Sequence, residues 1–270
     1  MGCGIAEVLA RAGIATVLHD AEESIARRGL ERIQASLEKA LARGKLSSLE
    51  PVLAHLQLAG DGCPPQLIIE AIFEDLELKK RLLGDWGQRY PDALLASNTS
   101  SLSLTEMAAS CLNPQRVIGL HFFNPAPVME LLEVVQAEQT SAETCQRALE
   151  LARRLGKTPI LVRDVAGFAS SRLGIVLGME AIRMVESGVA SVADIDRAME
   201  LGYRHPMGPL RLTDLVGLDV RLAIAEHLTR EIGAQFSPPP LLRRLVRAGR
   251  LGKKTGQGFY RWDAQGAVLE

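Results

Sequence analysis

The sequence predicts an α/β domain with a doubly wound, mainly parallel sheet, followed by an all-helical domain. Up to about residue 164, short β-branched runs alternate with amphipathic segments of ten or more residues, which is the pattern of βαβ units. Beyond that point the patterned segments have helical periodicity, and none is a convincing strand. We therefore expect one domain at residues 1–164 and a second at residues 165–270.

The expected elements follow from this periodicity. Ile5, Val8, Leu9 and Ala12 share one face of a helix, whereas residues 67–72 (LIIEAI) are typical of a buried strand. In the first domain we expect helices at residues 2–12, 22–43, 75–88 and 141–155. We expect strands there at residues 14–19, 67–72, 93–97, 116–123, 131–135 and 159–162. In the second domain we expect helices at residues 168–187, 192–201, 209–232 and 240–248.

The composition excludes several classes of protein. Hydrophobic residues make up 47% of the chain and charged residues 23%, so a chain of this length can bury a large core. The formal net charge of −1 gives no attraction for nucleic acid. The four cysteines have no paired spacing, which disfavours a zinc site or a disulfide framework and suits a reducing compartment. No signal peptide or apolar run near 18 residues is evident. We expect a cytoplasmic protein with no metal site, no nucleic-acid partner and no membrane segment.

Two residues near the start suggest a dinucleotide-binding unit. Gly2 opens the first helix, and Asp20 follows the next strand 18 residues later. A glycine at such a helix start and an acid about 20 residues further on are the last glycine and the ribose-binding residue of a dinucleotide fold. An ordinary helix–strand unit with a turn aspartate explains these two residues equally well.

Seven segments together resemble the 3-hydroxyacyl-CoA dehydrogenase family. They follow the family's order along essentially the whole chain, and seven blocks in register are far more specific than one. The segments are residues 70–76 (EAIFEDL), 97–102 (SNTSSL), 119–125 (GLHFFNP), 129–134 (MELLEV), 194–199 (DIDRAM), 205–209 (HPMGP) and 252–260 (GKKTGQGFY). The resemblance implies that Met1 and Gly2 end a glycine-rich loop. We therefore expect a Rossmann-type domain whose first strand and first two glycines are missing from the sequence.

The resemblance also implies catalytic residues. Oxidation of a secondary alcohol needs a base at the hydroxyl, and histidine is the usual one. His121 matches the family's base, and Glu133 matches the carboxylate that orients it. By themselves, a histidine at a strand end is more often structural, and Glu133 could be an outward-facing strand residue. Ser100 resembles the serine that binds the substrate's oxygen, and we include Ser171 as a substrate contact.

For the cofactor, the resemblance implies NAD. The expected cofactor-binding residues are Gly2, Asp20, Glu74, Lys79, Asn124 and Lys254. Other interpretations remain open for several of them. Glu74 has the position of a helix-start acid, Lys79 could be a solvated lysine, and Asn124–Pro125 is also an ordinary turn sequence.

The sequence departs from the family's pattern in two further places. In residues 166–172 (AGFASSR), Ser171 stands where the family commonly has an active-site asparagine, and a serine has a shorter reach and fewer donors. Residues 60–65 (GDGCPP) replace a longer segment that usually includes a short helix. We expect both changes to affect affinity or specificity more than the reaction type.

The resemblance implies NAD-dependent oxidation of (S)-3-hydroxyacyl-CoA to 3-oxoacyl-CoA, or the reverse. The substrate is expected to be a short-chain acyl-CoA such as 3-hydroxybutyryl-CoA, and the chain is expected to form a homodimer through its helical domain. One alternative is a dehydrogenase of a free hydroxy acid such as L-gulonate, because one architecture supports different substrates. A second alternative is an inactive, truncated fragment that only dimerises.

Overall fold

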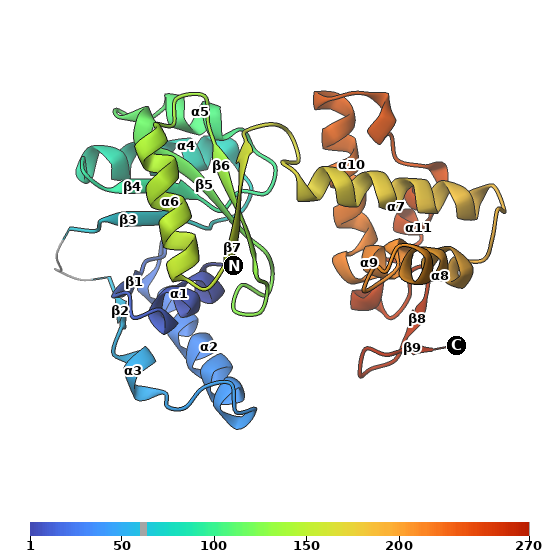
Figure 1. Ribbon diagram of the computed structural model, residues 1–270, viewed down its shortest axis with the longest axis horizontal. Helices are drawn as coiled ribbons and strands as arrows, with labels where there is room; N and C mark the ends of the chain where they lie inside the picture. Colours follow the sequence, from blue (N-terminus) through green and yellow to red (C-terminus); the bar gives the residue numbers. More distant parts are fainter. Residues whose placement is uncertain (60–63, 270) are drawn as a thin grey trace. The chain divides into compact units, whose positions relative to one another are not determined.

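The computed structural model describes residues 1–59 and 64–269, which divide into two compact units (Figure 1). Unit 1 is Met1–Asp164 and unit 2 is Val165–Glu270. Unit 1 is α/β with a mainly parallel sheet, and unit 2 is predominantly helical. The predicted fold class is therefore confirmed. Of the segment 60–65 that departs from the family's pattern, residues 60–63 lie outside the described residues.

The elements of unit 1 follow the predicted alternation. Its helices are α1 (Gly2–Arg11), α2 (Glu23–Ala42), α3 (Glu50–Leu53), α4 (Leu76–Arg89), α5 (Leu104–Ala109), η1 (Pro114–Arg116) and α6 (Ala142–Arg154). Its strands are β1 (Thr16–Leu18), β2 (Leu56–Leu58), β3 (Leu67–Glu70), β4 (Leu94–Ser97), β5 (Val117–Phe122), β6 (Leu131–Gln136) and β7 (Thr158–Arg163). Four of these, α3, β2, α5 and η1, were not predicted, because segments of three to six residues carry too little periodicity.

Strand order determines which side chains meet. Five strands pair in the order β3-β4-β5-β6-β7, and only the pairing of β5 with β6 is antiparallel. The carboxyl ends of β3, β4 and β5 therefore share one edge of the sheet, where α/β proteins bind their ligands. β1 and β2 form a separate parallel pair, and no ladder joins them to β3 among the described residues.

Helices cover both faces of the sheet of unit 1. Leu94 and Ala96 point to one face and share a core cluster with apolar residues of α1 and α6. Leu95 points to the other face, towards α4. Gly87 of α4 lies so close there that an added Cβ would come within 2.9 Å of Leu95 Cδ1. This alternation is the two-residue period of a strand, and it explains why β4 and β5 are buried along their whole length.

The elements of unit 2 are α7 (Ser170–Glu186), α8 (Val192–Gly202), α9 (Pro209–Val216), α10 (Leu218–Glu231), η2 (Ala234–Phe236), α11 (Pro240–Arg247), η3 (Lys253–Thr255), β8 (Arg261–Trp262) and β9 (Val268–Leu269). Two predictions were wrong in detail. The single helix expected at residues 209–232 is two helices, because Gly217 has a positive φ of 103° that breaks the helical path. The expectation of no strand was also wrong, since β8 and β9 form a short antiparallel pair.

Candidate active site

His121 and Glu133 lie side by side in the sheet of unit 1. They are directly opposite each other in the antiparallel register of β5 and β6. His121 Nδ1 lies 2.7 Å from Glu133 Oε2. Glu133 is fully buried, whereas His121 keeps 8% of its surface exposed. The strand pairing therefore fixes this contact between residues twelve positions apart.

The chemistry of the two groups determines the tautomer of the imidazole. An ionised carboxylate only accepts hydrogen bonds, so Nδ1 of His121 must carry the proton that it donates to Glu133. The other ring nitrogen, Nε2, is then left with a lone pair in the neutral imidazole. Such an oriented imidazole can remove a proton from a substrate hydroxyl, and the carboxylate stabilises the imidazolium that results.

Ser100 lies in the turn that follows β4 and is held by Glu74. The Ser100 backbone N–H donates to Glu74 Oε1 at 2.7 Å, and its hydroxyl donates to the same oxygen at 3.0 Å. The Thr99 hydroxyl donates to both oxygens of Glu74, at 3.0 and 3.1 Å. Asn98 Oδ1 accepts from the backbone N–H of Phe122 at 2.9 Å, which ties the turn to the end of β5. The structure thus brings together two residues predicted separately, Ser100 for the substrate and Glu74 for the cofactor.

Lys79 is not a solvated lysine. It is 1% exposed, and its Nζ lies 2.6 Å from Glu70 Oε1 and 3.3 Å from Glu74 Oε2. Glu70 also accepts from the Ser97 hydroxyl at 2.6 Å and from the Ile72 backbone N–H at 2.7 Å. Glu70 was not among the predicted site residues, although a carboxylate inside an apolar run needs a buried partner and was therefore a usable signal.

Three of the residues expected at the cofactor, Gly2, Asp20 and Asn124, lie at or near the ends of elements of unit 1. Asp20 is exposed two residues beyond β1, and its Oδ1 accepts from the backbone N–H of Ala21. Gly2 begins α1, and a Cβ added to it would lie 3.8 Å from Ala71, just beyond β3. A cavity of about 250 Å³ is lined by the start of α1 and by Asn124 and the residues after it. These features are compatible with binding of a dinucleotide: an exposed carboxylate, a glycine at a helix start and this cavity.

Two predicted residues lie in unit 2. Ser171 is in the first turn of α7 and is partly exposed. Lys254 lies in η3, and its Nζ contacts Asp219 Oδ1 and Oδ2 at 2.6 and 2.7 Å. Within unit 1, the structure groups His121 with Glu133, and Glu74 and Lys79 with Ser100.

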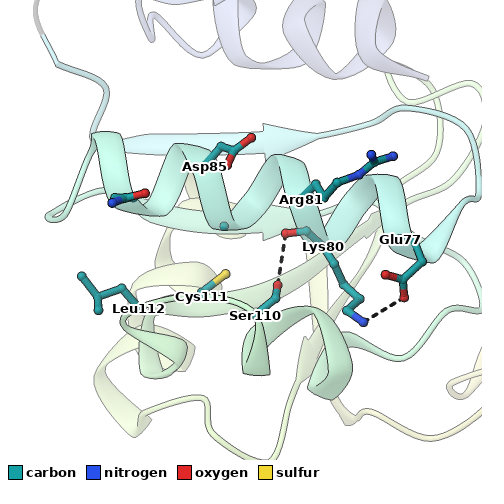
Figure 2. Close-up of a pocket in the computed structure, with 9 residues that line it drawn as sticks. Glu77, Lys80, Arg81, Asp85, Ser110, Cys111 and Leu112 are labelled. Carbon is teal, nitrogen blue, oxygen red and sulfur yellow. Dashed lines mark hydrogen bonds and ion pairs between the residues drawn. The ribbon is translucent and has the colours of Figure 1, made fainter.

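A second, larger cavity of unit 1 contains none of the predicted residues. It has a volume of about 580 Å³ and lies between α4 and the segment after α5 (Figure 2). Lys80 pairs with Glu77 on one side, and the Ser110 hydroxyl donates to the Lys80 carbonyl oxygen. Cys111 also lines it, and burial raises the pKa of this thiol, which disfavours a reactive thiolate. Nothing in this cavity resembles a catalytic arrangement.

Across residues 1–59 and 64–269, no group of three or more histidine, cysteine, aspartate or glutamate side chains is placed to hold a metal ion. In the same part of the chain, no helix has both the length and the apolar character needed to cross a bilayer.

The sequence matches two family descriptions that together cover almost the whole chain. Residues 1–165 match "3-hydroxyacyl-CoA dehydrogenase, NAD binding domain". Residues 167–262 match "3-hydroxyacyl-CoA dehydrogenase, C-terminal domain".

Individual relatives agree with these matches. A probable 3-hydroxybutyryl-CoA dehydrogenase of Deinococcus radiodurans is 43% identical over 97% of this chain and 96% of its own length. A 3-hydroxyadipyl-CoA dehydrogenase of Escherichia coli K12 is 41% identical over 98% of this chain, which spans 58% of that protein. The crystal structure of (S)-3-hydroxybutyryl-CoA dehydrogenase from Ralstonia eutropha is 36% identical, with a TM-score of 0.92 over 97% of this chain and 95% of that one.

Proposed function

The chain belongs to the 3-hydroxyacyl-CoA dehydrogenase family of NAD-dependent oxidoreductases, and we propose that it oxidises (S)-3-hydroxyacyl-CoA to 3-oxoacyl-CoA or catalyses the reverse reaction. The proposed substrate is a short-chain ester such as 3-hydroxybutyryl-CoA, which is named in the relatives from Deinococcus and Ralstonia. The observation that carries the chemistry is the contact of His121 with Glu133 at 2.7 Å.

The reaction removes a proton from the C3 hydroxyl and a hydride from C3 itself, which leaves a carbonyl. When bound, NAD supplies the nicotinamide that accepts the hydride. His121 Nε2 accepts the hydroxyl proton, and the resulting imidazolium keeps its Nδ1–H directed at Glu133. In the reducing direction the same nitrogen returns the proton to the developing alkoxide. A positioned acid or base of this kind typically contributes about 10²–10⁴-fold to the rate.

We assign binding of the substrate's oxygen to the hydroxyl of Ser100, and we keep Ser171 as a substrate contact. The support for Ser100 is that Glu74 and the β4 turn hold it rigidly at the carboxyl edge of the sheet. Glu74 accepts from the backbone and the hydroxyl of Ser100 with one oxygen, Oε1. Lys79 stabilises this arrangement, because its ammonium group lies between Glu70 and Glu74.

For the cofactor we assign Gly2, Asp20, Glu74, Lys79, Asn124 and Lys254. The preference for NAD over NADP rests on Asp20. An exposed carboxylate beyond β1 can accept from both ribose hydroxyls, and it repels a 2′-phosphate. Turnover with NAD and with NADP at equal concentrations tests this assignment, and faster turnover with NADP would refute it.

We also propose a homodimer, formed through unit 2. Large apolar side chains are exposed at helical spacing on two helices that pack together: Leu173, Val176 and Leu177 on α7, and Leu212, Leu215 and Val216 on α9. An exposed apolar surface of this extent is typical of an interaction site. The cytoplasmic location suggested by the cysteines remains part of this proposal.

A direct assay separates this function from its alternatives. NADH formation at 340 nm is followed with (S)-3-hydroxybutyryl-CoA and, separately, with L-gulonate at the same concentration. We expect turnover of the thioester and little or none of the free acid. Faster turnover of L-gulonate would favour the hydroxy-acid alternative. No turnover of either, together with no NADH binding by calorimetry, would favour an inactive fragment.

A further inference from the structure

Glu70, the last residue of β3, is a buried carboxylate to which the proposed reaction gives no role. Its side chain is fully buried, and its two oxygens accept from three donors. Oε1 accepts from Lys79 Nζ at 2.6 Å and from the Ile72 backbone N–H at 2.7 Å, and Oε2 accepts from the Ser97 hydroxyl at 2.6 Å. This arrangement needs an acceptor at both positions, which a carboxylate provides and an amide does not.

The three donors lie on different segments at the carboxyl edge of the sheet. Ile72 follows β3, Lys79 lies in the first turn of α4, and Ser97 ends β4. Ser97 is also directly opposite Glu70 in the parallel register of β3 and β4. One carboxylate therefore joins the turns after β3 and β4, and these turns carry residues that we assign to the cofactor and to the substrate's oxygen.

A first route from Glu70 to the site passes through Lys79. An ammonium group has three N–H donors, and three protein oxygens surround this one: Glu70 Oε1 at 2.6 Å, the Ile72 carbonyl oxygen at 3.3 Å and Glu74 Oε2 at 3.3 Å. Lys79 is only 1% exposed. Since Glu70 makes the shortest of the three contacts, it anchors the ammonium group, which in turn attracts Glu74.

A second route passes through Ser97. Its hydroxyl donates to Glu70 and accepts from the Thr99 backbone N–H at 3.2 Å. The Thr99 hydroxyl donates to both oxygens of Glu74, and Glu74 Oε1 accepts from the backbone N–H and the hydroxyl of Ser100. Both routes therefore end at Glu74, the residue that holds Ser100.

We propose that Glu70 is a positioning residue of the active site, which sets the position of Glu74 and thereby of Ser100. This inference rests on the proposed function, in which the Ser100 hydroxyl binds the substrate's oxygen. Glu70 acts through Lys79 and Ser97 and contacts neither the substrate nor NAD. The position of Ser100 matters because a displacement of about 1 Å at a reacting centre can lower the rate by about 10²-fold.

The variant Glu70→Gln keeps the size of the side chain but changes both routes. Its amide has one oxygen, which can face either Lys79 and Ile72 or Ser97, but not all three. The amide is also uncharged, so Glu74 alone among the described residues remains as an anionic partner of Lys79. We expect the ammonium group to draw Glu74 Oε2 closer, which moves Oε1 away from Ser100.

The test is a double-mutant cycle of Glu70→Gln with Ser100→Ala, measured as turnover of (S)-3-hydroxybutyryl-CoA at saturating NAD. In the parent background, we expect Glu70→Gln to lower kcat/KM by at least about tenfold. The loss should be mainly in kcat, because the oxygen that Ser100 contacts becomes more negative in the transition state. In the Ser100→Ala background, the same change should cost less than about threefold, since the hydroxyl that Glu70 positions is already absent.

Asp196→Asn in unit 2 is the matched control. Asp196 is 3% exposed and also accepts from three donors, the backbone N–H groups of Leu210 and Arg211 and the Tyr260 hydroxyl. This change also converts a buried carboxylate to an amide, but it lies outside the routes to Ser100. Per folded molecule, kcat/KM should stay within about twofold in both backgrounds.

Two results would overturn the inference. One is an equal fold-loss from Glu70→Gln with and without the Ser100 hydroxyl, since a merely structural role would act alike in both backgrounds. The other is a Glu70→Gln variant that keeps the parent's kcat/KM, which would mean that Glu74 holds Ser100 without help from Glu70. A parent enzyme that does not oxidise the ester would give a different result, because it would refute the proposed function and with it the inference.

A second variant keeps the test valid if Glu70→Gln does not fold. Ser97→Ala removes only the second route and leaves the ion pair of Glu70 with Lys79 in place. We expect kcat/KM to fall several-fold in the parent background and to change little in the Ser100→Ala background. Equal losses in the two backgrounds would contradict a role of Glu70 in positioning Ser100.

Discussion

Glu133 in unit 1 and Asp214 in unit 2 are both fully buried carboxylates, but their partners differ in kind. Glu133 contacts an imidazole, a group that gains and loses a proton near neutral pH. Asp214 of α9 accepts from the backbone N–H groups of Phe259 and Tyr260 and from the indole N–H of Trp262, each at 2.9 Å. None of these three donors releases its proton in the ordinary pH range.

The comparison separates two uses of the same buried group. At Asp214 the fixed donors all come from one segment near the C-terminus, so the carboxylate joins that segment to α9. Asp196 of α8 acts similarly, since it accepts from the backbone N–H groups of Leu210 and Arg211 and from the Tyr260 hydroxyl. At Glu133 the partner can change its charge, which is the basis of our proposal that this buried carboxylate supports proton transfer. On that proposal, the nature of the donor distinguishes a structural carboxylate from one that assists catalysis.

The largest expected effect is on the histidine of this pair. His121→Ala should lower kcat by at least about 10²-fold and leave NADH affinity nearly unchanged, because the positioned acid or base is lost while the cofactor site remains. Steady-state kinetics and calorimetric titration with NADH measure the two quantities. His55→Ala, in the same unit, is the control and should behave as the parent. If His121→Ala turned over within a few-fold of the parent, His121 would have no part in proton transfer.

A smaller but more specific effect is expected from the carboxylate. In Glu133→Gln the imidazolium loses its anionic partner, so less free energy favours the protonated ring. On the acidic side of the pH profile, kcat/KM falls to half of its maximum at one pH value. This acidic midpoint should therefore move down by roughly one pH unit. The measurement is the pH profile of kcat/KM for the variant and the parent. Superimposable profiles would mean that Glu133 only packs in the sheet and that the contrast with Asp214 does not hold.

The corresponding change in unit 2 should affect stability and leave the pH profile of catalysis alone. In Asp214→Asn, the amide NH₂ would face an N–H donor in place of a carboxylate oxygen. An unsatisfied buried polar group costs about 1–3 kcal/mol, so the free energy of unfolding should fall by about that amount. Chemical denaturation with urea measures it. A variant as stable as the parent would show that Asp214 does not hold the C-terminal segment in place.

The smallest expected effect is on the pH dependence of stability. Burial raises the pKa of Asp214 and of Asp196 above 3.8, although their hydrogen bonds act in the opposite direction. Between 3.8 and the raised value, the folded chain binds more protons than the unfolded chain, so the free energy of unfolding falls as the pH rises through this window. This fall should be shallower in Asp214→Asn than in the parent when urea denaturation is repeated between pH 4 and pH 7. Parallel curves would contradict the raised pKa of Asp214.

Periodicity and turn chemistry predicted most of the fold. The helices of residues 22–43, 75–88 and 141–155 lie within one or two residues of α2, α4 and α6, because each has an apolar face. Asp75 and Ser141 also mark the starts of α4 and α6, since each caps its helix with a side-chain hydrogen bond. Periodicity failed at Gly217, because the apolar pattern continues through a residue whose φ of 103° interrupts the helix. It also failed at β8 and β9, since two-residue strands have no period to detect.

The sequence by itself determined the family, the fold class and the chemical types present at the site, including a histidine, a carboxylate twelve residues later and serines at turns. Only the tertiary structure decided which of these side chains are partners. It placed Lys79 between Glu70 and Glu74, and it joined Asp214 to residues 45 to 48 positions away. The reason is physical. Periodicity depends on neighbours along the chain, whereas the free energy of a buried polar group depends on contacts that form only when distant segments pack together.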